Sequence, residues 1–243
     1  MYNIERQRQI LSILLQKKRC SVSKLAKELY ASEATIRRDL NVLASEGKIE
    51  KVFGGAIICE NYAEEVPFSV RKDERVNVKQ IICAKASTLI QEGMTVFLDS
   101  SSTTEQLAPY LKRFRNLQII TNSPRVPLLL ADSTLQVYST GGRMSSSSQA
   151  YVGGIAEDVI EQVNADIFFF SARGVSNEGI ITDSAQNESR IKQKMLKNSK
   201  VSCFLCDSNK IGLTYMSSIT NCKQVDYVFS NVELEENLQG KNQ

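Results

Sequence analysis

The segment from Ser32 to Leu43 constrains the fold of this chain more than any other stretch of the sequence. Ser32 is suited to the start of a helix, because its side-chain oxygen can accept a hydrogen bond from a free backbone amide of the first turn. Apolar residues then recur at steps of four and three, namely at Ile36, Leu40 and Leu43. This spacing predicts a short helix with one apolar stripe that is buried against the rest of the fold.

The opposite face of this helix is polar and carries two adjacent guanidinium groups. The residues on that face are Thr35, Arg37, Arg38 and Asn41. In the major groove of DNA, arginine can donate two hydrogen bonds to guanine, and asparagine can pair with adenine. The pattern therefore favours a helix that contacts base edges. An ordinary surface helix with an exposed arginine pair is the alternative, which this segment alone does not exclude.

The segment before it, Ser21–Leu29, has the pattern of another short helix, capped by Ser21 or Ser23. Residues 30 and 31 alone separate this helix from the cap of the next one. A connection that short is typical of a helix-turn-helix.

The flanking segments complete a small domain. Upstream, residues 4–15 have the apolar periodicity of a first helix, and downstream Gly47 is suited to end the Ser32–Leu43 helix in a left-handed conformation. Residues 48–53 then alternate like a strand, which turns at 54–55 before the apolar residues 56–58. Residues 1–58 are therefore predicted to form a winged helix-turn-helix.

Charge supports this interpretation. Residues 1–58 contain 11 Lys and Arg against 6 Asp and Glu, a net of +5, whereas the rest carries 19 against 21, a net of −2. Positive charge is thus concentrated where phosphate contacts would be needed. We expect double-stranded DNA as the partner. The DNA-binding residues that we predict are Ser21, Ser32, Thr35, Arg37, Arg38, Asn41 and Lys48.

Beyond residue 58 the pattern changes twice. Residues 59–76 are rich in charge and are predicted to be a linker, and residues 77–243 alternate short apolar strands with helices. We expect strands at 95–98, 117–120, 135–138, 166–170, 201–206 and 226–229. We expect helices at 78–90, 105–112, 126–131, 153–163 and 187–198. This alternation predicts a doubly wound α/β domain with a mostly parallel sheet.

The cysteines suggest no framework of disulfides or metal ligands. Cys203 and Cys206 have the spacing of a pair, but they fall within a predicted strand, where positions three apart point to opposite faces. The chain has no histidine, so we expect neither a metal site nor a cofactor. The sequence also shows no apolar run of about 18 residues and no signal peptide, which favours a reduced, cytoplasmic protein without membrane contact.

Hydroxyl-rich turns follow several of the predicted strands. In open α/β sheets ligands bind beyond the carboxyl ends of the strands. Residues 100–104 lie between a strand and a helix, so their amides and hydroxyls can hold a phosphate at the positive end of the helix. Serine and threonine also cap helices without binding anything. The spacing leaves both interpretations open.

The chain resembles the DeoR family of bacterial transcriptional regulators over nearly its whole length. The motifs that carry this resemblance, in the family's order, are Thr35–Leu40, Gly54–Ala56, Asp99–Thr104, Thr121–Ser123, Gly141–Gly142, Glu188 ahead of Lys192 and Met195, and Asp207–Lys210. The resemblance implies a winged helix-turn-helix followed by a sensor domain similar in fold to ribose-5-phosphate isomerase. It further implies a repressor of a sugar or polyol catabolic operon that a sugar phosphate releases from DNA.

The resemblance also implies an effector pocket and a homo-oligomer, either a dimer or a tetramer. The effector-binding residues that it implies are Asp99, Ser102, Thr103, Thr104, Glu188, Asp207 and Lys210. The chain departs from the family pattern at three places. Phe53 stands where the wing usually has histidine, Ser101 where a glycine is common, and Ser171–Arg173 in place of a glycine-rich strand end.

Two alternatives to a regulator that responds to a sugar phosphate stay open. One is a sugar-phosphate isomerase with an added DNA-binding head, in which Glu188 or Asp207 is the base and Lys210 stabilises the enediolate oxygen. The strand end at 171–174 lacks the acidic cluster of such isomerases, so we expect a chain that is not an enzyme. The other is a regulator whose α/β domain serves only for dimerisation.

Overall fold

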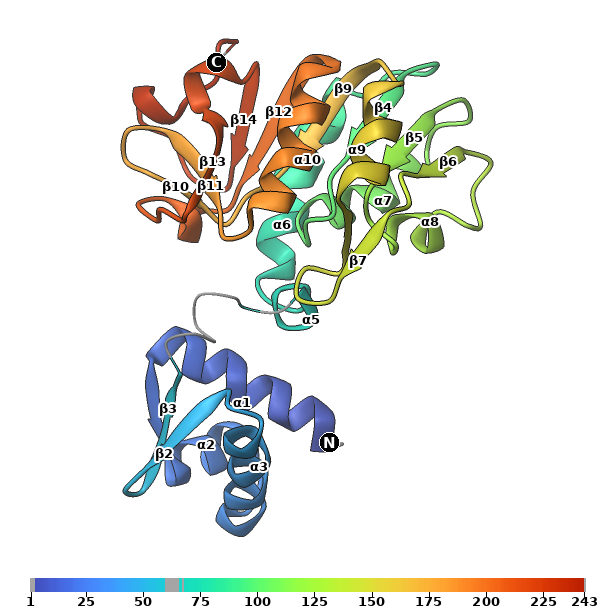
Figure 1. Ribbon diagram of the computed structural model, residues 1–243. Helices are drawn as coiled ribbons and strands as arrows, with labels where there is room; N and C mark the ends of the chain where they lie inside the picture. Colours follow the sequence, from blue (N-terminus) through green and yellow to red (C-terminus); the bar gives the residue numbers. More distant parts are fainter. Residues whose placement is uncertain (1–2, 60–65, 67, 243) are drawn as a thin grey trace. The chain divides into compact units, whose positions relative to one another are not determined.

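The computed structural model describes residues 3–59, 66 and 68–242. It divides into two compact units, Met1–Glu74 and Arg75–Gln243 (Figure 1). Of the predicted linker, residues 60–65 and 67 lie outside the described residues. No helix among the residues described has both the length and the apolar character needed to span a membrane.

The first unit combines helices with a small antiparallel sheet, of which Figure 1 labels β2 and β3. The strand order is β1-β3-β2. Its helices are α1 (Asn3–Lys17), α2 (Val22–Glu28), α3 (Glu33–Ser45) and α5 (Phe68–Arg71). Its strands are β1 (Arg19–Ser21), β2 (Ile49–Val52) and β3 (Gly55–Ile58). This confirms the predicted winged helix-turn-helix, to which the structure adds the short strand β1.

Local chemistry explains where α2 and α3 begin and where α3 ends. The Ser21 hydroxyl accepts a hydrogen bond from the amide of Lys24, and the Ser32 hydroxyl accepts one from the amide of Thr35. Gly47 takes a positive φ of 69°, and the amide of Lys48 donates to the carbonyl of Leu43 over 3.1 Å. This is a Schellman ending, which satisfies carbonyls that the helix leaves free.

The second unit is built on a six-stranded sheet in which every neighbouring pair is parallel, in the order β14-β12-β9-β4-β5-β6. Its strands are β4 (Thr95–Leu98), β5 (Gln118–Thr121), β6 (Gln136–Ser139), β9 (Ala165–Phe170), β12 (Ser199–Cys206) and β14 (Tyr227–Ser230). The chain runs outward from β4 to β6 and then outward again from β9 to β14. The sheet is therefore doubly wound, as the sequence predicted.

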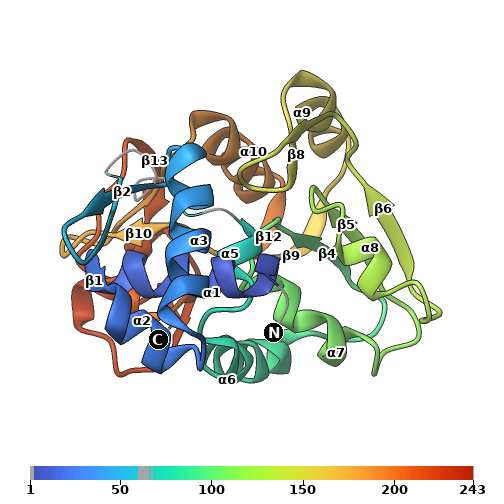
Figure 2. The ribbon, with the colours of Figure 1, turned by 90° about the horizontal axis from the view of Figure 1, so that it is seen from below.

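Helices cover both faces of this sheet, with α9 and α10 on one side and α6 and α7 on the other (Figure 2). The helices are α6 (Val76–Ala86), α7 (Ala108–Leu111), α8 (Val126–Leu129), α9 (Gly154–Glu161) and α10 (Gln186–Lys197). Single 3₁₀ turns lie at η1 (Ser87–Leu89), η2 (Thr104–Leu107), η3 (Ser208–Lys210), η4 (Cys222–Gln224) and η5 (Glu236–Leu238).

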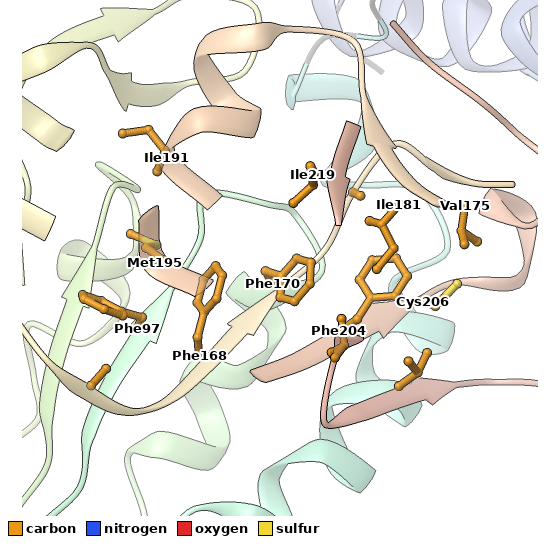
Figure 3. Packing of buried hydrophobic residues seen from close by; sticks show 14 of the residues in the cluster. Phe97, Phe168, Phe170, Val175, Ile181, Ile191, Met195, Phe204, Cys206 and Ile219 are labelled. Carbon is orange, nitrogen blue, oxygen red and sulfur yellow. The ribbon is translucent and has the colours of Figure 1, made fainter. Parts of the chain in front are cut away.

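The central strands are apolar on both faces because both faces are covered. Phe168, Phe170 and Phe204 belong to the core on the α10 side, where Met195 of α10 lies near Phe97 and Phe168 (Figure 3). Phe169 belongs instead to the core on the α6 side. The two cysteines of β12 are likewise divided, Cys206 in the first core and Cys203 in the second, so they lie on opposite faces as predicted. Burial raises the pKa of the Cys206 thiol to about 11, which makes it unreactive at neutral pH.

Two small antiparallel sheets were not predicted. Their strands are β7 (Arg143–Ser145) with β8 (Ala150–Val152), and β10 (Gly174–Val175) with β11 (Ile180–Asp183) and β13 (Ser217–Asn221). The serine-rich residues 145–148 fall at the turn between β7 and β8.

Candidate functional site

Helix α3 buries its apolar stripe and exposes its polar face. Ile36 is fully buried, and Leu40 and Leu43 are nearly so. Arg37, Arg38 and Asn41 are exposed, which leaves these polar groups accessible to the edges of bases.

The surroundings of the exposed groups differ. Arg37 donates to the carboxylate of Glu33 over 2.9 Å, and both side chains face solvent. Asn41 accepts a hydrogen bond from the ammonium of Lys51 on β2, over 2.7 Å. Arg38 has no hydrogen-bond or ion-pair partner in the described part of the chain.

The other predicted DNA-binding residues lie at helix ends. Ser21 and Ser32 cap α2 and α3, and the hydroxyl of Thr35 lies 2.9 Å from that of Ser32. Lys48 follows the end of α3 and pairs with Glu46 over 2.5 Å. These side chains therefore stabilise the unit, and their contact with DNA stays a prediction.

A buried carboxylate inside α3, not singled out in the sequence, fixes the helix in place. Asp39 is 3% exposed and accepts hydrogen bonds from the Nε of Arg6 at 2.5 Å and from the side-chain amide of Gln7 at 3.2 Å. Both partners lie on α1, so this cluster sets how α3 lies against α1. An aspartate in a polar helix gives no signal of a partner 33 residues away.

In the second unit, Asp99 follows β4 at the point where the strand order reverses between β4 and β9. It is fully buried, and its carboxylate accepts hydrogen bonds from the amide of Ser101 at 3.0 Å, the hydroxyl of Thr104 at 2.6 Å and the amide of Ser171 at 3.0 Å. Asp99 thus holds the turn after β4 together from within. Ser101 adopts no positive φ, so the serine fits this turn without strain.

Lys192 of α10 reaches the same carboxylate from the other side. Its ammonium lies 3.5 Å from Asp99 and makes a close ion pair with Asp183 at the end of β11. Burial alone would lower the pKa of Lys192, but the carboxylates of Asp183, Asp99 and Glu188 together outweigh it and raise that pKa above its ordinary value. The lysine is therefore charged at neutral pH and neutralises part of a buried acidic group.

Helix α6 contributes a second buried lysine, which the sequence analysis did not select. The Nζ of Lys79 donates to the hydroxyl of Ser102 over 3.1 Å, and Lys79 is 5% exposed. The neighbouring Thr103 is buried, and its carbonyl accepts from the thiol of Cys83. Lys79 thus brings positive charge to the hydroxyl-rich turn.

Two further cations lie at the ends of β9 and β12. The Nζ of Lys210 donates to the hydroxyl of Ser171 over 2.5 Å. The guanidinium of Arg75 binds both carboxylate oxygens of Asp207, at 3.0 and 2.9 Å, and the hydroxyl of Ser208 at 3.2 Å. Asp207 is therefore paired within the unit.

Polar groups at the end of β5 border the same turn. Asn122 is 2% exposed, and its amide nitrogen donates to the carbonyl of Tyr151 at 3.1 Å and lies 3.4 Å from the hydroxyl of Ser100. Its side-chain oxygen Oδ1 is buried and has no hydrogen-bond partner among the described residues. An unsatisfied buried acceptor has a free-energy cost that a donor from a ligand would remove.

The predicted effector residues thus fall into sets with different surroundings. Ser102, Thr103 and Thr104 belong to the turn after β4, which Asp99 holds together. Lys210 meets this end of the sheet through Ser171. Glu188 lies in the first turn of α10, near Lys192. No group of three or more His, Cys, Asp or Glu side chains in the residues described is placed to hold a metal ion.

Comparison with known families decides the identity of the chain. Residues 6–62 match the DeoR-like helix-turn-helix domain, and residues 74–232 match the DeoR C terminal sensor domain. The chain belongs to the DeoR family of transcriptional regulators.

Similar proteins carry both activator and repressor names. The HTH-type transcriptional regulator GolR of Listeria innocua is 32% identical, over 100% of this chain and 96% of its own length. The L-fucose operon activator of Haemophilus influenzae is 31% identical, over 95% and 92%. The lactose phosphotransferase system repressor of Streptococcus mutans is 29% identical, over 97% and 94%.

Among solved structures, the chain is similar to ribose 5-phosphate isomerase A of Methanocaldococcus jannaschii. The TM-score is 0.41 at 15% identity, over 56% of this chain and 54% of that one. The curated relatives named above are regulators, not enzymes, in agreement with the prediction for this chain.

Proposed function

We propose that the chain is a cytoplasmic repressor of a sugar or polyol catabolic operon. Helix α3 recognises the operator DNA through base contacts made by Arg38, Arg37, Thr35 and Asn41. The observation that carries this proposal is the division of α3 into a buried apolar stripe and an exposed polar face. A single head of this size covers few base pairs, so the operator is bound by a dimer or tetramer whose heads contact successive half-sites.

A phosphorylated sugar is the proposed effector, and its phosphate binds at the turn 100–104. Three observations support this seat. Lys79 and Lys210 bring cations to hydroxyls at this end of the sheet, where they can pair with a phosphate, and the unpartnered side-chain oxygen of Asn122 can accept a hydrogen bond from a sugar hydroxyl. The turn also follows β4 at the reversal of strand order, where open α/β sheets bind ligands.

Helix α6 is the element through which binding would reach the DNA-binding unit. Arg75, the first residue of the second unit, immediately precedes α6, and Lys79 lies one turn into it. A phosphate that competes with Ser102 for Lys79 alters the contact that α6 makes with the turn. Effector binding can change DNA affinity only as far as the effector binds the released state more tightly than the DNA-bound state.

Selection of DNA by the full-length protein tests the proposal directly. Duplexes with a random central region are incubated with the protein, recovered and sequenced, first alone and then with pentose, hexose or polyol phosphates. We expect a repeated half-site, lost in the presence of one phosphate and kept with the corresponding unphosphorylated sugar. The absence of any enriched sequence at moderate ionic strength would overturn the proposal.

A further inference from the structure

Phe53 occupies the tip of the hairpin between β2 and β3 and is the most exposed apolar side chain in the described residues, with a relative exposure of 109%. Single exposed apolar side chains are common on protein surfaces. Exposure alone is therefore not evidence that Phe53 binds a partner. Its position and the rigidity of the turn that carries it are the relevant observations.

The turn that carries Phe53 is held in place by the backbone around it. Gly54 has a φ of 75°, which suits glycine, and its carbonyl accepts a hydrogen bond from the amide of Val22 over 2.8 Å. At Gly55, an added Cβ would lie 2.4 Å from the carbonyl oxygen of Cys20, so β3 and β1 are in close backbone contact. The phenyl ring thus projects from an ordered support.

The hairpin also borders the polar face of α3. Lys51, two residues before Phe53, donates to the side chain of Asn41 over 2.7 Å. The surroundings are cationic overall, with a net charge of +5 over residues 1–58. A cationic surface next to base-contacting groups fits a nucleic acid better than an apolar protein partner.

We propose that Phe53 is a wedge that inserts between stacked base pairs at the edge of the operator and kinks the duplex. A phenyl ring has no atom that can read the hydrogen-bonding edge of a base, but it can replace a neighbouring base in the stack. Pyrimidine–purine steps unstack most easily, so Phe53 selects such a step without bonding to it. The inference rests on the proposed contact of α3 with DNA.

The test uses the full-length protein and the duplex that it selects, labelled at both ends for energy-transfer measurement of bending. We expect Phe53→Ala to reduce the bend, to weaken binding about tenfold or more and to abolish the preference for a pyrimidine–purine step. Phe53→Leu keeps an apolar wedge and retains most of the bend. Tyr30→Ala removes another aromatic side chain of this unit, 97% exposed, and leaves the bend unchanged.

A second duplex carries a mismatch at the selected step, which removes part of the cost of unstacking. We expect the wild type to bind this mismatched duplex more tightly than the matched one. We expect Phe53→Ala to bind both duplexes with equal affinity. If Phe53→Ala bends and binds the duplex like the wild type while Arg38→Ala binds it more weakly, the proposed wedge is wrong and the proposed function stands. If no duplex is selected, both are wrong. Loss of oligomeric mass in Phe53→Ala, with the bend retained, would identify a contact between copies and overturn the wedge.

Discussion

Arg38 and Arg37 are neighbours on α3, yet their surroundings predict different contributions to DNA binding. Arg38 has no ion-pair partner within the described residues, whereas Arg37 is paired with Glu33. Arg38→Ala should weaken operator binding by about 1–3 kcal/mol and relax base preference at one position. Arg37→Ala should cost less, because Arg37 must leave Glu33 to contact a base. Gel-shift titrations on the selected duplex measure both affinities, and equal losses would contradict the ranking.

Lys192 neutralises buried carboxylates, so its removal should destabilise the second unit. Lys192→Met leaves Asp99 and Asp183 without their cation, which typically costs about 3–5 kcal/mol. The raised pKa of Lys192 means that its stabilisation is complete at neutral pH and is lost only as pH rises through that folded-state pKa, above the ordinary range of a lysine. Urea unfolding between pH 7 and the alkaline range measures this.

The control for Lys192→Met is Lys200→Met, which removes an exposed lysine paired with Asp166. Because solvent screens such a pair, we expect little change in the free energy of unfolding. A similar loss of stability in the two variants would show that the buried ion pair of Lys192 contributes no more to the free energy of unfolding than the exposed pair of Lys200.

At the level of elements, the close contact between β1 and β3 predicts that a side chain at Gly55 would destabilise the wing. Gly55→Ala places a Cβ 2.4 Å from the carbonyl oxygen of Cys20, so the strands must separate. We expect about 1–3 kcal/mol of destabilisation, confined to the first unit, in thermal unfolding. Gly154→Ala is the control, since no atom lies within 4 Å of the added Cβ. Its stability should equal or slightly exceed that of the wild type.

Elements that the sequence predicted well are those whose signals are local. Ser32 and Gly47 mark the two ends of α3 through bonds to residues three to five positions away, so the pattern in the sequence is sufficient. Strand β1 has three residues, and its pairing with β3 spans more than thirty positions. A segment that short has no periodicity to detect, and the same reason explains why β10 was missed.

The candidate site shows the same division. The turn after β4 was predicted because hydroxyls gather there in the sequence. Its cations were predicted less completely, since Lys79 bonds to Ser102 across 23 positions and nothing in the sequence around Lys79 indicates that partner. Asp39 and Lys192 are similar cases, in which burial, visible only in the fold, turns a common charged residue into a fixed contact.

On the scale of the whole molecule, the chain has separate cores in its two units, one around α1, α2 and α3 and the others on the two faces of the parallel sheet. Each unit therefore has its own source of stability. A proposed effector in the second unit can influence operator binding through the segment that joins the units or through the oligomer. Arg75 and Lys79 lie at the start of the second unit, so they are the residues at which such coupling should be detectable.

Thermodynamic linkage then predicts that the effect is reciprocal. If a sugar phosphate weakens operator binding by some factor, the operator must weaken phosphate binding by the same factor, typically 5- to 150-fold or about 1–3 kcal/mol. Calorimetric titration of the phosphate into the protein, with and without the selected duplex, measures one side of this relation, and DNA titration with and without phosphate measures the other.

Lys79→Ala should bring both factors close to one while DNA affinity without effector is kept. Lys85→Ala, on the same helix but bonded to the carbonyl of Ser230, should leave both factors unchanged. Equal loss of coupling in the two variants would show that α6 acts only as support, and a factor of one in the wild type would exclude release by that phosphate.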